Sequence, residues 1–473
     1  MKNLFKNQPT LYKYWLTFTF LMGIGLVWVI PPFQSPDEFN HFYRAYQIAD
    51  GHFGCEFNAD SSEIGGNIPL SLLKISRPFD SLESYPNNKV SLDTIVQYLK
   101  TPLERDIKVF EAFPNTARYA PTAYFPQAIS IFILRLFNAP PLWMMYLGRL
   151  ANFLFWWVIV GFAVAKTPYF KHFFMVLLLL PASLAINSTS NADVSTYALF
   201  FLIFGFFFQF REKKGEISNS ELIKFATLIF ITTLNKICYF PILFLLLFIE
   251  KEKFGSLKKK VTYIGFNGAI NLALAVAWSQ YVHTLVYPKS YNPSFTTYES
   301  LHLGFKVNPD LQTQFILQNP FVFLQNLIIK SSETVHNSYG SWIGSFGWES
   351  KLPSGLIDVM WYFLLIFVLF CDYKFKIWER VGLAMVAFGT TMLFLLSTHL
   401  HWDGVGDFIE NGWHGKYYIP IFPLYFWALS GIFSNFVKDR KSILLGFKVF
   451  SILIFIAVYV DFAILIYDRY YKI

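Results

Sequence analysis

Two acids, a histidine and an arginine stand together just past the first apolar stretch of the chain: Asp37, Glu38, His41 and Arg44. A carboxylate here would lie at the depth of the lipid headgroups, where it could deprotonate an acceptor hydroxyl while the other reactant stays anchored in the bilayer. If a helix begins near residue 37, Asp37, His41 and Arg44 share one of its faces. The pattern indicates a general base, Asp37, with Glu38 beside it.

A helix cap explains the same residues without chemistry. Ser35 or Asp37 would cap a juxtamembrane helix, and His41 and Arg44 would pair with the cap for stability. Further polar groups in matching positions favour the chemical interpretation.

Three of these groups lie within or between apolar runs. Asp193 ends a polar turn at 187–193, where an Asx turn or a helix cap is the competing interpretation. Lys236 interrupts two short apolar segments and needs an anion from elsewhere in the fold. Arg149 stands alone in an apolar run and is expected to face the protein interior. Both cations are candidates to bind a phosphate.

The segment 398–418 gathers three acids, three histidines and one lysine between two apolar spans. Asp403, His414 and Lys416 are its candidate substrate-binding residues. The ligand types would suit a metal, but their spacing matches no standard pattern and loop polarity explains most of them. Lys416, at the entrance of the next span, is expected to contact a phosphate. A loop of glycines and aromatics at 337–349 suits either sugar stacking or an interfacial aromatic belt.

The elements that must position these residues are transmembrane helices. Of the 473 residues, 54% are hydrophobic and only 15% are charged, which predicts an all-α polytopic membrane protein. The net charge of +8 comes from short basic blocks between apolar runs, so it is a topology signal and not a nucleic-acid surface. The three cysteines indicate neither a disulfide framework nor a zinc site.

A span needs about 20 apolar residues, and the chain offers about eleven candidates. They lie at 15–32, 141–165, 172–189, 192–210, 222–235, 237–250, 261–285, 353–371, 377–398, 416–434 and 443–467. The pair 222–235 and 237–250 is short and is interrupted at Asn235 and Lys236, with Pro241 close behind. This pattern predicts a broken hairpin that lines a cavity.

Basic connectors at 211–214, 251–260, 374–380 and 438–441 should face the cytoplasm. This holds only if the amphipathic stretch 119–137 lies at the interface and does not cross. The outward-facing parts of one single membrane domain, 1–473, are then a large first loop with juxtamembrane helices at 33–140, a second at 286–352 and a third, acidic and histidine-rich, at 399–415.

Five stretches of the chain resemble one bacterial family. They are SPDEFNHFYRAY at 35–46, YAPTAYFP at 119–126, PAS at 181–183 with NAD at 191–193, LNKICYFP at 234–241, and GKYYIP at 415–420. With these residues the chain resembles the membrane proteins grouped as domain of unknown function 2142, which belong with the C-type (GT-C) glycosyltransferases. The resemblance covers nearly the whole chain.

The resemblance implies a GT-C-like fold and an enzyme of the bacterial inner membrane, with its active site on the extracytoplasmic side. The donor would be a sugar on a polyprenyl phosphate and the acceptor a cell-envelope glycan or lipid. Asp37 corresponds to the base and Glu38 to its neighbour. Asp193 corresponds to an acid that in some relatives helps to bind a metal or the acceptor, so a divalent cation (Mg²⁺ or Mn²⁺) held by Asp37 and Asp193 stays open. The chain departs from the family where Lys416 replaces a common arginine and His414 a glutamine.

In such an enzyme the lipid phosphate leaves as a stable anion, so positive charge suffices to assist it. Lys236, Lys416 and Arg149 are the candidates, and a single displacement would invert the anomeric carbon. The alternatives are a polysaccharide polymerase or ligase-like enzyme, a transporter of a lipid-linked saccharide, which should show internal symmetry, and a scaffold without chemistry.

Overall fold

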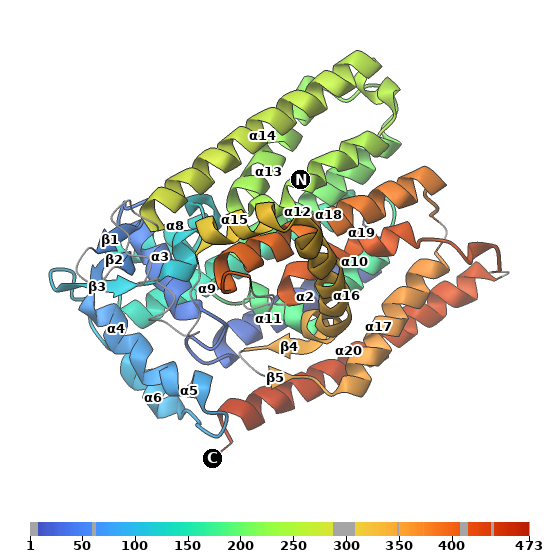
Figure 1. Ribbon diagram of the computed structural model, residues 1–473. Helices are drawn as coiled ribbons and strands as arrows, with labels where there is room; N and C mark the ends of the chain where they lie inside the picture. The colour runs from blue at the N-terminus through green and yellow to red at the C-terminus, as the bar shows by residue number, and fades with distance from the viewer. Residues whose placement is uncertain are drawn as a thin grey trace.

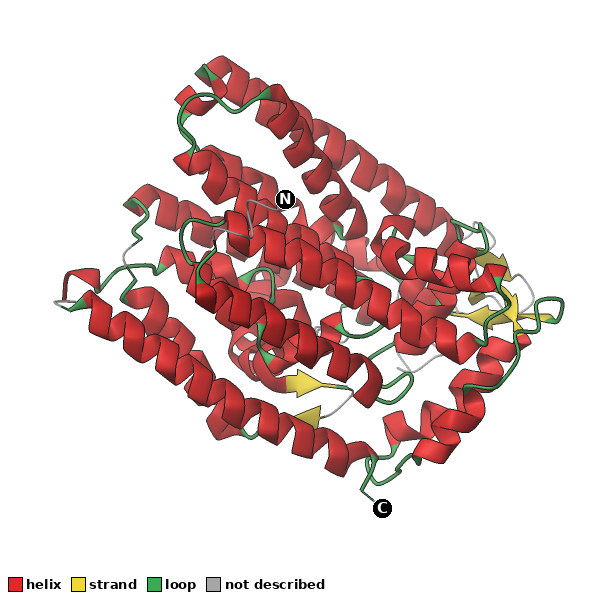
Figure 2. Cartoon of the chain, turned by 180° about the vertical axis from the view of Figure 1, so that it is seen from behind, coloured by secondary structure: helices red, strands yellow, loops and turns green. Residues whose placement is uncertain are grey.

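The computed structural model describes residues 8–58, 63–286, 308–347, 350–371, 373–406, 415–436 and 439–472. Helices dominate the molecule, and strands form only two small patches (Figure 2). This confirms the prediction of a helical membrane protein.

Five helices of the described residues are long and apolar enough to cross a membrane. They are α9 (Pro141–Lys166), α12 (Asp193–Glu212), α14 (Leu257–Val286), α18 (Ile377–Trp402) and α20 (Arg440–Tyr470). The first helix, α2 (Thr10–Val29), packs against α9, and α17 (Ser354–Leu369) runs beside α20 (Figure 1). Shorter apolar helices complete the bundle, and the count of eleven spans stays a prediction.

The two ends of α12 mark two opposite ends of the molecule, about 30 Å apart for a helix of 20 residues. At one end, Arg211 pairs with Glu379 at 2.6 Å and donates to the Phe248 carbonyl at 2.6 Å, so the basic connectors meet there. At the other end, Asp193 contacts Lys236 and Lys416. These basic connectors and the polar turn before α12 therefore lie at opposite ends of that helix, and the side of the membrane that each faces stays a prediction.

The hairpin after α12 is interrupted where the sequence predicted. Helix α13 (Asn219–Asn235) is followed by Lys236, whose backbone is extended, and the chain continues as η3 (Ile237–Phe248), a 3₁₀ helix that contains Pro241. Its 12 residues cover about 24 Å at the 3₁₀ rise, further than an α-helix of equal length. The predicted span 172–189 is also broken, by Pro181, into α10 (Lys171–Leu178) and α11 (Pro181–Asn187).

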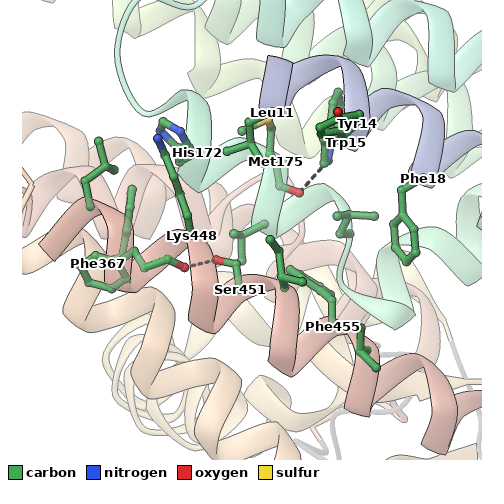
Figure 3. Close-up of a pocket in the computed structure, with 16 residues that line it drawn as sticks. Leu11, Tyr14, Trp15, Phe18, His172, Met175, Phe367, Lys448, Ser451 and Phe455 are labelled. Atoms are coloured by element: carbon green, nitrogen blue, oxygen red, sulfur yellow. Dashed lines mark hydrogen bonds between the residues drawn. The ribbon is translucent and has the colours of Figure 1, made fainter. Parts of the chain in front are cut away.

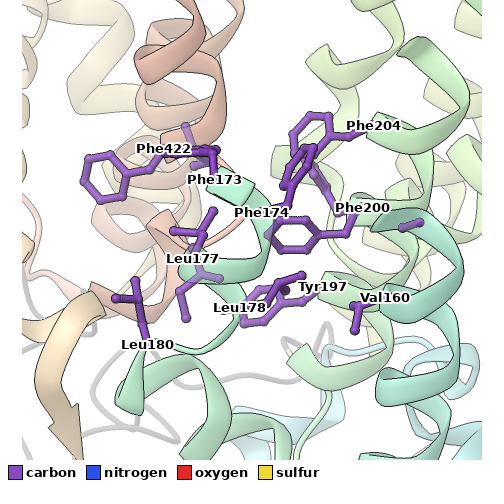
Figure 4. Packing of buried hydrophobic residues seen from close by; sticks show 14 of the residues in the cluster. Val160, Phe173, Phe174, Leu177, Leu178, Leu180, Tyr197, Phe200, Phe204 and Phe422 are labelled. Atoms are coloured by element: carbon purple, nitrogen blue, oxygen red, sulfur yellow. The ribbon is translucent and has the colours of Figure 1, made fainter. Parts of the chain in front are cut away.

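The core of the bundle is largely aromatic. Phe173 and Phe174 of α10 lie between Phe204 of α12 and α19 (Phe422–Ala428) (Figure 4). Phe174 stacks on Phe204, with ring centroids 6.1 Å apart, and Phe173 meets Phe426 edge-on. Such offset and edge-on contacts add to the apolar area that the rings bury.

The first loop holds a sheet as well as the predicted helices, and this corrects the all-helical expectation. Strands β1 (Glu56–Asn58), β2 (Glu63–Pro69) and β3 (Lys108–Ala112) pair antiparallel in that order. Strand β2 has little strand propensity. It can nevertheless pair closely with β3 because Gly65 has no Cβ, and a Cβ at this position would clash with the Glu111 carbonyl. The loop's helices are α3 (Glu38–Ala49), α4 (Leu70–Ser76), η1 (Arg77–Phe79), α5 (Asp80–Ser84), α6 (Leu92–Tyr98), α7 (Pro114–Ala117), η2 (Pro121–Tyr124) and α8 (Phe125–Leu136).

Helix α8 occupies the amphipathic stretch. Its 12 residues extend about 18 Å, too short to cross a bilayer core of about 30 Å. Gln127, Ala128 and Ile131 are buried, while Ile129 and Ile133 are exposed. This agrees with the prediction that the segment does not cross.

The second large loop contains α15 (Pro309–Gln318) and α16 (Pro320–Gly344), followed by a two-stranded sheet of β4 (Ser345–Phe346) and β5 (Ser350–Lys351). Most of the expected glycine and aromatic loop is therefore the end of a helix. Trp342 is wholly buried and packs on Phe422, with ring centroids 4.2 Å apart, so its face is not open to a sugar. The remaining short elements are η4 (Lys251–Phe254), η5 (Gly415–Tyr418) and η6 (Ser434–Phe436).

Candidate functional site

Asp37 takes the left-handed conformation, with φ 61° and ψ 15°, directly before α3. Only a few per cent of residues other than glycine do so. Its carbonyl accepts the first helical bond, from the His41 amide at 3.0 Å, but its side chain does not cap the helix. The carboxylate is partly exposed. The capping interpretation therefore does not account for this side chain.

Glu38, the next residue, is wholly buried in an ion pair with Arg149. The guanidinium donates to both carboxylate oxygens, at 2.7 and 2.6 Å, and its other N–H groups bind the carbonyls of Val27, Ile30 and Pro31. Arg149 thus has no N–H group left for a lipid phosphate, contrary to expectation, and Glu38 is sealed from any acceptor. Both residues fix the backbone on which Asp37 stands.

Asp193 is held between two lysines. Its Oδ1 lies 2.7 Å from the Lys236 Nζ, and its Oδ2 lies 3.4 Å from the Lys416 Nζ. The N-cap residue of α12 is Ala192, and the Oδ1 of the preceding Asn191 accepts from the Asp193 and Val194 amides. The Asp193 carboxylate therefore binds two lysines, Lys236 and Lys416, that come from distant segments of the chain. Two ammonium groups against one carboxylate leave a net positive charge at a buried position.

Aromatic rings and hydroxyls complete this cluster. The Lys236 Nζ lies 4.0 Å from the centre of the Tyr417 ring and 5.3 Å from that of Tyr119, which stabilises the ammonium group. The Tyr197 hydroxyl donates to the Lys416 carbonyl at 2.8 Å, and the Tyr239 hydroxyl donates to the Tyr417 carbonyl at 3.1 Å. These bonds hold η5 against α12 and η3.

His41 joins helix α3 to the cluster. Its Nδ1 lies 2.8 Å from the Tyr124 hydroxyl. Burial, with the nearby charges of Lys416 and Lys236, lowers the pKa of His41 to about 3, so the ring is neutral at ordinary pH. Arg44 does not join them, because its donors bind Gln47 and the carbonyls of residues 52 and 53 in the first loop.

A cavity of about 300 Å³ lies beside Lys416 and the segment that leads into Asp37. Ser35 and Pro36 line one side and Lys416 another. Lys351 of β5 also lines it and adds a second cation, which no sequence pattern had indicated. The charge of Asp37 acts on Lys416 and on Tyr119, so the acid and the cations share one electrostatic environment. This cavity can take an anionic ligand near a carboxylate.

Glu83 of α5 is a second group that the sequence did not reveal. Burial, with the charges of Asp37 and Asp80, raises the pKa of Glu83 to about 7. Because Glu83 is partly protonated near neutral pH, it adds less than one full negative charge beside Asp37. No sequence signal marks it, since it lies far along the chain from residue 37.

The acidic and histidine-rich segment is only partly described. Asp403 is buried and lies 2.9 Å from the His399 Nδ1, and His399 contacts Gln312 of α15. These contacts place Asp403 with His399 and Gln312, where α15 meets the end of α18. His414 lies outside the described residues.

The residues at the site do not fit a divalent cation. Both oxygens of Asp193 already face ammonium groups, which would repel a metal ion. Among the residues that the structure describes, no group of three or more His, Cys, Asp or Glu side chains could hold one. The metal site that Asp37 and Asp193 were expected to share is therefore not supported.

The comparisons with known proteins identify one family. A family model described as predicted membrane protein (DUF2142) matches residues 20–425. Neither the search of curated proteins nor that of solved structures found a match. The matched range includes all five stretches and every residue of the cluster described above.

Proposed function

The chain belongs to the DUF2142 family of predicted membrane proteins, and we propose that it is a glycosyltransferase of the bacterial inner membrane. It would move a sugar from a polyprenyl-phosphate donor to a glycan or lipid acceptor of the cell envelope. Its GT-C relationship, its eleven spans and the outward orientation of Asp37 are parts of this proposal.

One observation carries the proposal: the cavity that Lys416 and Lys351 line has Pro36, the residue directly before Asp37, in its wall. The charge of Asp37 acts on Lys416, and the Asp37 side chain makes no cap hydrogen bond to α3. Lys236 reaches Lys416 through Asp193. A base and a cationic site are the two groups that sugar transfer from a lipid phosphate needs.

The reaction is a single displacement. The acceptor hydroxyl attacks the anomeric carbon while Asp37 takes its proton, so a bond forms between the acceptor oxygen and that carbon. The bond from the same carbon to the phosphate oxygen breaks, and its electron pair leaves with the lipid phosphate. Lys416 and Lys236 offset the negative charge that grows there, so no acid is needed. The anomeric configuration is inverted.

The experiment is a mass profile of the glycans and lipid-linked saccharides of the source cell with the gene intact, deleted or changed to Asp37→Asn. We expect the variant to lose transfer by roughly 10²–10⁴-fold, because it keeps the volume of the side chain but removes the base. Deletion and Asp37→Asn should both lose one sugar increment and accumulate the unmodified acceptor.

Asp93→Asn is the matched control, because Asp93 is an exposed acid of the same loop. It should leave the profile unchanged. Full activity of Asp37→Asn would refute the assignment of the base. A profile that deletion does not alter would refute the transferase and favour transport.

A further inference from the structure

A second pocket lies away from the candidate site, between α2, α10, α17 and α20 (Figure 3). Its volume is about 260 Å³, and its wall is almost entirely apolar. The side chains that shape it include Trp15, Phe18, Met175, Phe367 and Phe455. Two polar groups of the wall are satisfied locally: the Trp15 Nε1 donates to the Met175 carbonyl at 2.9 Å, and the Ser451 hydroxyl donates to its own helix at 2.7 Å. The pocket therefore suits a hydrocarbon chain.

The pocket carries positive charge in its wall. Lys448 of α20 and His172 of α10 both line it, and the charge of Lys448 acts on His172. Figure 3 shows the two side chains near each other, apart from Phe18 and Phe455. Within the described part of the chain, no acid forms an ion pair with Lys448. An ammonium group beside an apolar pocket suits a ligand that carries both an anion and a hydrocarbon chain.

The dimensions match one leaflet of a bilayer. The pocket follows α20 from Leu444 to Ile456, a length of about 18 Å, and half of the hydrocarbon core is about 15 Å. Past Ile456, the Phe18 and Tyr459 rings pack edge-on with their centroids 5.6 Å apart, and the Tyr459 hydroxyl donates to the Leu179 carbonyl at 2.8 Å. These contacts bring α20 against α2 and the C-terminal end of α10 and limit the depth of the pocket.

The pocket also lies toward the basic end of the molecule. Lys448 is in the first third of α20, whose other end at Tyr470 accepts a hydrogen bond from Val90 of the first loop. The candidate site with Lys236 and Lys416 is at that other end. The ligand of the pocket is therefore distinct from a donor whose phosphate binds the two lysines.

We propose that this pocket binds one acyl chain of an anionic phospholipid from the leaflet at the basic end, with the lipid phosphate against Lys448 and His172. A zwitterionic lipid would gain the same apolar contacts, but its own cation would weaken the pairing with Lys448. The pocket should therefore prefer phosphatidylglycerol to phosphatidylcholine.

The test is native mass spectrometry of the purified full chain, titrated with phosphatidylglycerol or phosphatidylcholine in detergent. We expect the wild type to retain phosphatidylglycerol preferentially and Lys448→Gln to bind it roughly tenfold more weakly, the loss expected for one charged hydrogen bond. Lys441→Gln is the matched control, because Lys441 is an exposed lysine near the start of the same helix and does not line the pocket.

A second variant tests the apolar part. Ser451→Phe fills the pocket at the cost of one local hydrogen bond, so it should reduce the binding of both lipids. Equal retention of the two lipids by the wild type would overturn the proposal. So would an equal loss of phosphatidylglycerol from the Lys448→Gln and Lys441→Gln variants, or unchanged binding of both lipids by Ser451→Phe.

Discussion

Arg149 donates two parallel hydrogen bonds to Glu38, at 2.7 and 2.6 Å, and both side chains are wholly buried. The pair joins α9 to the start of α3. Because Arg149 also binds three carbonyls at the end of α2, it fixes the turn that ends in Asp37. The left-handed conformation of Asp37 needs such support, since it is unfavourable for this residue.

Glu38→Gln should therefore destabilise the protein by about 3–5 kcal/mol, the cost of leaving a buried charge without its partner. The measurement is the midpoint of thermal unfolding in detergent. Glu104→Gln breaks an ion pair of similar length, 2.7 Å to Lys74, that is exposed, and it should cost about 1 kcal/mol or less. Equal effects of the two substitutions would show that Glu38 is not a structural anchor.

Lys236→Met should weaken binding of a polyprenyl phosphate roughly tenfold, because it removes one charged donor and leaves Asp193 to offset Lys416. Equilibrium binding of the lipid phosphate to the purified protein measures this. Lys259→Met is the control, since Lys259 is exposed in the basic end of the molecule. Undiminished binding by Lys236→Met would remove Lys236 from the phosphate site.

Much of the candidate site could be predicted because its residues break local rules. Lys236 interrupts an apolar hairpin and Asp193 starts an apolar helix, so each had to find a partner in the fold. The structure brings both together with Lys416 and His41. The sequence did not specify the pairing itself, because Lys236 and Asp193 come from different helices.

The rest depended on contacts that leave no local pattern. Arg149 was expected at a phosphate, yet it binds Glu38, and nothing near either residue in the sequence signals that pairing. Strand β2 pairs with β3 although its Gly65 and Gly66 weaken its strand propensity. Glu83 gained its position beside Asp37 only through the folding of the first loop.

Glu83 predicts a pH dependence of stability. Its pKa rises from 4.5 in the unfolded chain to about 7 in the fold, so the folded state binds more protons between these values. The contribution of Glu83 to stability is therefore fully present below pH 4.5 and is lost as the pH rises toward 7. Glu83→Gln cannot ionise, so its melting temperature should rise relative to the wild type across this window and level off above pH 7. A difference that stays constant from pH 4.5 to 7 would contradict the assigned pKa.

Gly415 places Lys416 against α16 by its lack of a side chain. A Cβ there would collide with the Ser341 hydroxyl and lie 2.9 Å from the Trp342 amide nitrogen, so η5 would have to move. Gly415→Ala should therefore shift Lys416 away from Asp193 and reduce transfer, with a destabilisation of about 1–3 kcal/mol from overpacking. Gly389→Ala is the matched control, because a Cβ there meets nothing within 4 Å. Transfer and thermal unfolding of both variants should be measured together. Wild-type behaviour of Gly415→Ala in both assays would show that this close approach does not position Lys416.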